Sequence, residues 1–247
     1  AGTGTGPARA VPARVVPGRA VPARVVVAEP DADEGWSEPG DAVTREPMLI
    51  ERLLTEESGA TTFVTVGRLS TEKNHARLLH AFRRVHTERP DTRLIVIGEG
   101  PLRDELDRTI VELGLTGAVV MAGQQENPYA IMARADCFVL SSDYEGQPMV
   151  ILEARILGLP VVSTAFGSVR GSLPDGVGLV VPTTPEGLAG GMTEFLRGAV
   201  PNPPFDAVEY NRAAIGQFYR AIGARPAEDG AVRCLGPTGI GGRLAAR

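Results

Sequence analysis

Short apolar runs alternate with longer segments of helical periodicity over most of the chain, and this alternation restricts the fold more than any other feature. The runs predicted as strands are residues 61–66, 94–97, 119–122, 137–140, 161–164 and 178–181. The segments predicted as helices are residues 74–88, 102–113, 129–134, 148–157, 185–196 and 208–222. Strands that alternate with helices predict βαβ units, so we expect an α/β domain with a single doubly wound, Rossmann-like parallel sheet. Such sheets bind ligands in the loops after the strands.

The segments on either side of this pattern differ from it in composition. The sequence RAVPARVV occurs at residues 9–16 and again at 19–26, and its prolines oppose both helices and sheet ladders. Residues 29–57 are acidic, and we interpret the D-x-D sequence at Asp31–Asp33, a pattern that can hold a divalent metal, as part of a solvated linker. The predicted organisation is a disordered or linker segment at 1–57, one domain at 58–222 and a disordered tail at 223–247.

Composition excludes several classes of protein. The formal net charge is -5 and aromatic residues make up only 5%, which argues against nucleic acid as a partner. The two cysteines, Cys137 and Cys234, form no CxxC pair, which excludes a cysteine zinc site and a disulfide scaffold. We find no apolar stretch of transmembrane length and no secretory signal. We therefore expect a cytoplasmic chain, either free or at the inner face of the membrane.

Common nucleotide and hydrolase motifs are also missing. A Walker P-loop needs a Gly-Lys pair, whereas the only lysine, Lys73, follows Glu72. A dinucleotide fingerprint that began at Gly98 would need its third glycine where Arg103 stands, and no G-x-S-x-G elbow occurs. Three histidines share the segment predicted as the first helix, but spacings of five and six residues do not align them on one face. We interpret them as helix-surface residues rather than metal ligands: His75, His80 and His86.

The first candidate site follows the first predicted strand, in the sequence GRLSTEKN at residues 67–74. Arg68 and Lys73 place two cations on a strand-to-helix loop, where helix amides and positive charge can bind a diphosphate. Two solvated surface charges are the alternative. Lys73 is the only lysine among 25 basic residues, and this rarity favours the functional interpretation.

The second candidate site follows the fourth predicted strand, in the sequence SSDYEGQPM at residues 141–149. Glu145 lies in this loop and Glu153 lies eight residues later in the next predicted helix. Gly146 lets backbone approach a ligand, and carboxylates suit the hydroxyl donors of a sugar or a ribose. Acidic residues are also common early in helices, so this spacing alone is weak evidence.

Five motifs in order over residues 60–222 carry a family resemblance: GRLSTEKN, GEGP, GQQENPY, SSDYEGQPMVILEA and GLPVVSTAFG. Together they resemble the carboxyl-terminal half of retaining glycosyltransferases of the family 4 type with the GT-B fold, in particular bacterial cell-wall and capsule enzymes. The resemblance implies transfer of a hexose from a nucleoside-diphosphate sugar to an acceptor, in cell-wall or surface polysaccharide synthesis. It implies no metal and no cofactor beyond the donor itself.

The resemblance also implies roles for individual residues. Arg68 and Lys73 would bind the donor diphosphate and stabilise its charge as it leaves, and Glu145 would contact the donor sugar. Glu153 would hold the ribose hydroxyls. The remaining residues that would line the donor site are Gly67, Gly98, Gly100, Gln124, Asn127, Gly146, Gln147 and Met149.

The chain departs from the family pattern in one respect. The full enzymes have an amino-terminal Rossmann-like domain that binds the acceptor, and residues 1–60 cannot form one. The chain is therefore expected to supply the donor-binding half, with an acceptor glycan or lipid-linked acceptor held by a domain that is missing here. Two alternatives stay open: a nucleotide-sugar binding module without activity, and a sugar-nucleotide epimerase of the same architecture.

Overall fold

The computed structural model of the chain describes residues 59–221, 224–226 and 232–234. The repeat at 9–26 and the acidic segment with Asp31–Asp33 lie outside these ranges, and the predictions made for them are not tested. Within the described ranges no helix is both long and apolar enough to cross a membrane.

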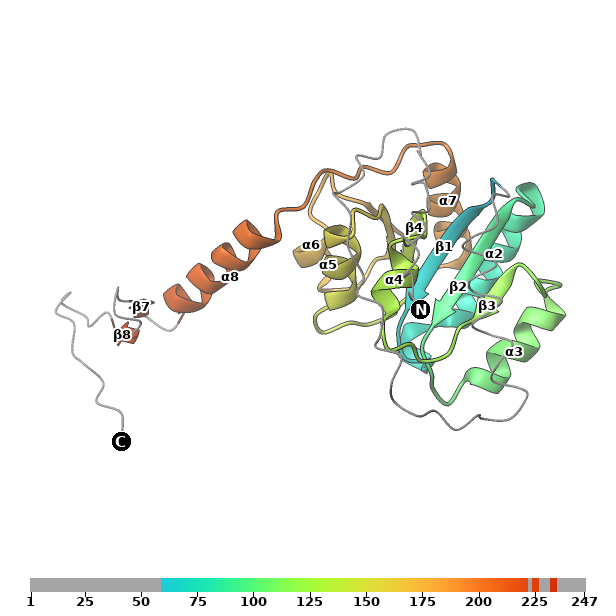
Figure 1. Ribbon diagram of the computed structural model, residues 1–247, viewed down its shortest axis with the longest axis horizontal. Coiled ribbons are helices and arrows are strands. Elements are labelled where there is room, and N and C mark those ends of the chain that lie inside the picture. Colours follow the sequence, from blue (N-terminus) through green and yellow to red (C-terminus); the bar gives the residue numbers. More distant parts are fainter. Residues whose placement is uncertain (1–58, 222–223, 227–231, 235–247) are drawn as a thin grey trace, which may run out of the picture. The chain divides into compact units, whose positions relative to one another are not determined.

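A six-stranded parallel sheet forms the centre of the larger unit (Figure 1), which confirms the predicted fold class. Its strands are β1 (Thr61–Val66), β2 (Thr92–Ile97), β3 (Val119–Met121), β4 (Cys137–Leu140), β5 (Val161–Thr164) and β6 (Leu179–Val181). Their order is β3-β2-β1-β4-β5-β6, so the chain reverses its direction of winding between β1 and β4. Doubly wound sheets bind their ligands at this switch point.

Within residues 59–204, six helices cover the two faces of this sheet. They are α2 (His75–Glu88), α3 (Arg103–Glu112), α4 (Pro128–Met132), α5 (Met149–Ile156), α6 (Val169–Ser172) and α7 (Pro185–Leu196). Successive strand residues point to opposite faces: Phe63 packs with buried residues of α2, α3 and α7, and Val64 packs with those of α4, α5 and α6. Both faces of the sheet are buried, which explains why the strand sequences are continuous apolar runs.

The predicted elements agree with the structure to within two residues at each end, and two short elements of the larger unit were not predicted. One is the 3-10 helix η1 (Thr71–Lys73) in the loop after β1, and the other is α6. Segments of three or four residues are too short to show a helical period. Sequence periodicity therefore cannot predict elements of this length.

The carboxyl-terminal part of the chain, Phe205–Arg247, is a separate compact unit. It contains α8 (Ala207–Ala221), whose apolar side chains Val208 and Phe218 are exposed. It also contains a short antiparallel pair, β7 (Ala224–Pro226) with β8 (Val232–Cys234), within the segment for which we predicted no regular structure. All the predicted site residues lie in the first unit, which ends at Pro204.

Candidate functional site

Two loops leave the sheet side by side at the switch point. The register pairs Phe63 of β1 with Cys137 of β4, so the two strands end at the same level. The loop after β1 runs through η1 to Asn74, which adopts a left-handed conformation with φ of 47°. The Asn74 side chain accepts a hydrogen bond from the backbone N–H of Arg77 and thereby caps α2.

Backbone and hydroxyl hydrogen bonds join these loops directly. The N–H of Asp143 donates to the carbonyl of Glu72 at 2.8 Å. The Ser141 hydroxyl donates to the carbonyl of Lys73, also at 2.8 Å. Both acceptors lie within η1, so the two bonds fix this short helix against the β4 loop, and residues about seventy positions away set the position of Lys73.

Asp143 adds a charged connection to the same contact. Its two carboxylate oxygens accept from Asn74 Nδ2 at 2.9 Å and from an Arg77 guanidinium nitrogen at 2.5 Å. Burial raises the pKa of Asp143, but the hydrogen bonds from Asn74 and Arg77 outweigh it and the net pKa lies below its ordinary value. Arg77 also donates to the carbonyl of Ser141 at 3.0 Å. This network holds the amino end of α2 against the β4 loop.

Lys73 and Glu145 meet at the centre of the two loops. The Lys73 ammonium donates to Oε1 of Glu145 at 2.6 Å, and the Ser142 hydroxyl donates to the same oxygen at 2.7 Å. The Lys73 side chain is 23% exposed and that of Glu145 only 10%. Ser168 donates to the backbone carbonyl of Glu145 at 2.7 Å. The structure thus brings together two of the three predicted catalytic residues as a part-buried ion pair.

Arg68, the third predicted catalytic residue, lies on the loop after β1 with an exposed side chain. No described residue forms a hydrogen bond or ion pair with its guanidinium. Its carbonyl accepts from the N–H of Ser70 at 2.9 Å, which closes a tight turn. Arg68 and Lys73 therefore share one loop, but only Lys73 is engaged by a carboxylate.

Gly98 and Gly100 allow the loop after β2 to pack against the loop after β1. Gly98 has a φ of 139°, and a Cβ there would lie 2.0 Å from the carbonyl oxygen of Gly67. A Cβ on Gly100 would lie 2.4 Å from the carbonyl oxygen of Leu69. The Leu69 N–H donates to the carbonyl of Glu99 at 3.0 Å. These glycines hold the cationic loop in place, while their proposed contact with the nucleotide stays a prediction.

The other predicted donor-site residues also lie after carboxyl ends of strands. Gln124 and Asn127 follow β3 and are exposed, and the Asn127 side chain caps α4 by accepting from the N–H of Ala130 at 3.3 Å. Gly146, Gln147 and Met149 follow β4, with side chains or backbone open to solvent, and Met149 begins α5. All of these positions lie at the edge of the sheet where the strands have their carboxyl ends, as expected for a parallel sheet.

Glu153 lies half-buried in α5, and it has a neighbour that the sequence analysis did not single out. The Glu153 carboxylate, with partial burial, raises the pKa of the Tyr129 phenol above its ordinary value. Tyr129 is 46% exposed at the start of α4. Its place in the GQQENPY motif was the available signal, because no role had been assigned to the aromatic residue of that motif.

The interpretation of the three histidines as helix-surface residues is wrong for His75. His75 is 3% exposed, its Nδ1 atom has no hydrogen-bond partner, and burial together with nearby Lys73 lowers its pKa to about 4. His80 is exposed, and His86 stacks on Phe82. His75 is the first residue of α2, and its side chain is buried. Among the described residues no three His, Cys, Asp or Glu side chains form a group that could bind a metal ion.

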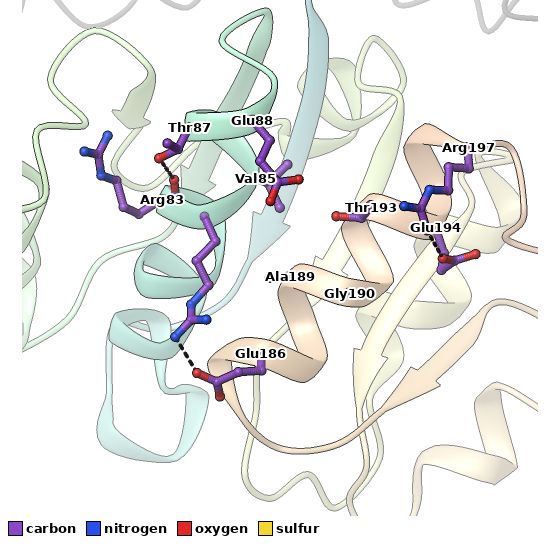
Figure 2. A pocket seen from close by; sticks show the side chains of 11 residues that line it. Arg83, Val85, Thr87, Glu88, Glu186, Ala189, Gly190, Thr193, Glu194 and Arg197 are labelled. Carbon is purple, nitrogen blue, oxygen red and sulfur yellow. Dashed lines mark hydrogen bonds and ion pairs between the residues drawn. The ribbon is translucent and has the colours of Figure 1, made fainter.

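A surface groove of about 600 Å³ lies elsewhere, between α2 and α7 (Figure 2). None of the predicted site residues lines it. Its charged side chains form ion pairs: Arg84 with Glu186 at 2.5 Å, and Arg197 with Glu194 at 2.7 Å. Because its cations are matched by carboxylates, the groove offers little net attraction to a diphosphate.

The parallel strand order β3-β2-β1-β4-β5-β6 is that of the doubly wound, Rossmann-like class of α/β domains. Residues 51–213 match the family model described as "Glycosyl transferases group 1". The chain belongs to this family, which confirms the resemblance stated from its motifs.

Two curated relatives illustrate the match. The chain is 41% identical over 101 residues to the N-acetylgalactosamine-N,N'-diacetylbacillosaminyl-diphospho-undecaprenol 4-alpha-N-acetylgalactosaminyltransferase of Campylobacter jejuni, covering 41% of this chain and 27% of that protein. It is 32% identical over 156 residues to the lipopolysaccharide core biosynthesis glycosyltransferase LpsE of Rhizobium meliloti, covering 61% of this chain and 45% of that protein. The chain thus spans less than half the length of either relative.

Solved structures share the fold. The crystal structure of Anabaena Alr3699/HepE in complex with UDP and glucose has a TM-score of 0.57 and 24% identity, over 70% of this chain and 52% of that one. The lipopolysaccharide outer core galactosyltransferase WaaB has a TM-score of 0.54 and 21% identity, over 67% of this chain and 51% of that one. At these identities the likeness concerns the fold alone.

Proposed function

We propose that the chain is the donor-binding half of a retaining glycosyltransferase that uses a nucleoside-diphosphate sugar. The observation that carries this proposal is the pairing of Lys73 with Glu145 at the switch point of the sheet, 2.6 Å apart. The Lys73 ammonium can bind a diphosphate, and the adjacent Glu145 carboxylate can accept hydrogen bonds from sugar hydroxyls. In a nucleoside-diphosphate sugar these two groups are joined by one bond, so neighbouring side chains can bind both. Family membership supports the same chemistry.

Different residues bind different parts of the donor. Lys73 and Arg68 bind the diphosphate, whose negative charge on the bridging oxygen grows as the bond to the sugar breaks. Cations already in place there lower the energy of the transition state more than that of the ground state. Glu145 accepts hydrogen bonds from hydroxyls of the sugar, and Glu153 accepts them from the ribose.

We propose that this electrostatic role needs no divalent metal, because Lys73 and Arg68 supply two positive charges at the diphosphate. The acceptor would bind a second domain, since the chain spans less than half of its curated relatives. Those relatives are named for lipid-linked and lipopolysaccharide glycans. An acceptor glycan or lipid-linked acceptor at the cytoplasmic face of the membrane, in surface polysaccharide synthesis, is the corresponding proposal for this chain.

Isothermal titration tests the proposal. The chain is titrated with UDP, GDP, ADP and CDP, and with the glucose conjugate of each, beside inorganic phosphate as a control for simple anion binding. We expect at least one nucleoside diphosphate to bind and inorganic phosphate to bind far more weakly. Absence of binding by the whole panel would contradict the proposed function. Conversion of a bound donor without acceptor would instead identify an epimerase.

A further inference from the structure

We propose that Ser142 is a positioning residue that fixes the orientation of the Glu145 carboxylate, so that one of its oxygens faces the donor sugar. This inference rests on the proposed function and extends it to a residue that does not itself touch the ligand. Ser142 follows β4 and is fully buried, with 0% of its surface exposed. A fully buried hydroxyl needs a partner, and its partner here is the site carboxylate.

The two oxygens of Glu145 have different surroundings. Oε1 accepts from the Ser142 hydroxyl at 2.7 Å and from the Lys73 ammonium at 2.6 Å. A carboxylate oxygen has two lone pairs, so these two donors fill Oε1. Among residues 59–221 no hydrogen bond reaches Oε2. The Glu145 carboxylate is therefore held by one oxygen, and the other stays available to a donor from a ligand.

The backbone of Ser142 is held in place from the neighbouring strand. Thr164, at the end of β5, donates through its hydroxyl to the backbone carbonyl of Ser142 at 2.6 Å. Ser168 donates to the backbone carbonyl of Glu145 at 2.7 Å. Both backbone positions are thus fixed on the β5 side of the loop, while Lys73 approaches from the β1 side. The Glu145 carboxylate is therefore held through Oε1 by one donor from the β4 loop and one from the β1 loop.

Sugar hydroxyls are the fitting partner for the open oxygen. Oε2 is an acceptor only, and hydroxyl groups donate. A diphosphate has no hydrogen to donate and is attracted to Lys73 and Arg68 instead. Loss of the Ser142 hydroxyl would leave Oε1 with Lys73 alone and let the carboxylate turn. Binding of the sugar should then suffer, whereas binding of the diphosphate should not.

The test compares Ser142→Ala with the wild-type chain, using the nucleoside diphosphate that binds best in the titration panel and its glucose conjugate. We expect Ser142→Ala to weaken the glucose conjugate about fivefold and to change the diphosphate less than twofold, because the variant loses the orientation of the carboxylate but no direct bond to the ligand. Ser163→Ala is the matched control, because its hydroxyl is equally buried but donates to the carbonyl of Thr164. Ser142→Thr, which restores a hydroxyl, should recover the ratio of the two affinities.

The outcomes separate the two proposals. Wild-type chain that binds none of the panel overturns the proposed function, and the inference falls with it. Wild-type chain that binds both ligands, with Ser142→Ala weakening both equally or neither, overturns the inference alone. Thermal unfolding of each variant shows that the fold is retained. If Ser142→Thr does not fold, the ratio for Ser142→Ala beside Ser163→Ala still decides.

Discussion

Lys73 and Glu145 stand 72 positions apart in the chain, and their charged atoms lie 2.6 Å apart in the structure. The contact exists because β1 and β4 are neighbours in the sheet, so the loops that follow them leave from adjacent strand ends. The residue proposed to bind the diphosphate and the residue proposed to bind the sugar are consequently coupled. A change in either residue alters the charge that surrounds the other.

Replacement of Glu145 by Gln should affect the two parts of the donor in opposite directions. Removing the negative charge frees Lys73 for the diphosphate, so the nucleoside diphosphate should bind more tightly, by about 1 kcal/mol. The nucleotide sugar should bind less tightly relative to the diphosphate, because an amide accepts sugar hydroxyls less strongly than a carboxylate does. Calorimetry measures the affinities for both ligands. The control for net charge is Glu112→Gln, at an exposed position of α3. Unchanged affinity for both ligands would exclude Glu145 from the site.

The two cations should differ in their effect on stability. Arg68→Ala and Lys73→Ala should each weaken nucleoside-diphosphate binding by about 1.5–3 kcal/mol, the range for a hydrogen bond to a charged group. Only Lys73→Ala should also lower the free energy of unfolding, since it leaves the Glu145 carboxylate, 10% exposed, with fewer donors. Denaturant unfolding and calorimetry together check this, with exposed Arg83→Ala as control. Equal losses of stability for Arg68→Ala and Lys73→Ala would argue against the assigned contacts.

A side chain at Gly98 should disrupt the packing of the two loops. Gly98→Ala puts a Cβ 2.0 Å from the carbonyl oxygen of Gly67, on a backbone with φ of 139°. We expect a loss of at least about 3 kcal/mol in the free energy of unfolding. Gly190→Ala is the control, because its Cβ would meet nothing within 4 Å on helix α7, and it should stabilise by about 0.5–1 kcal/mol. Chemical denaturation of both variants tests the contrast, and a mild effect at Gly98 would refute the close approach.

His75 should make stability depend on pH. Burial, with a smaller effect of Lys73, lowers its pKa from an ordinary value of 6.5 to about 4 in the folded state. Between these values the unfolded chain binds more protons, so stability is complete above pH 6.5 and falls as the pH is lowered toward 4, by about 3 kcal/mol. His75→Leu should remove this part of the pH dependence, whereas exposed His80→Leu should retain it. The measurement is the free energy of unfolding at several pH values, and parallel curves for wild type and His75→Leu would contradict the prediction.

Removal of divalent metal should leave donor binding intact. The proposal assigns the diphosphate charge to Lys73 and Arg68, so titration of the nucleoside diphosphate in EDTA and in Mg²⁺ should give affinities within about twofold. A strong requirement for Mg²⁺ would show that the two cations do not suffice. Lys73→Ala offers a further comparison, because dependence on Mg²⁺ that arises only in this variant would mark the lysine as the group that replaces the metal.

The sequence by itself predicted the elements and the loops that carry the site. Apolar runs such as residues 61–66 and 137–140 are local patterns, and each follows from the burial of both faces of a parallel strand. The GRLSTEKN and SSDYEGQPM motifs come directly after those runs, so strand ends and motif residues could be placed together without coordinates. Arg68, Lys73 and Glu145 could be named for the same reason.

Contacts between distant segments were decided by the tertiary structure. The pairing of Lys73 with Glu145, and the donation of Ser142 to the same oxygen, require the strand order that makes β1 and β4 neighbours. The clash that excludes a side chain at Gly98 depends equally on where the Gly67 carbonyl lies. Burial of His75 follows from how the first turn of α2 packs, which its spacing from His80 could not reveal. Local periodicity records which face of an element is buried, whereas hydrogen bonds across the switch point depend on how the elements are ordered in space.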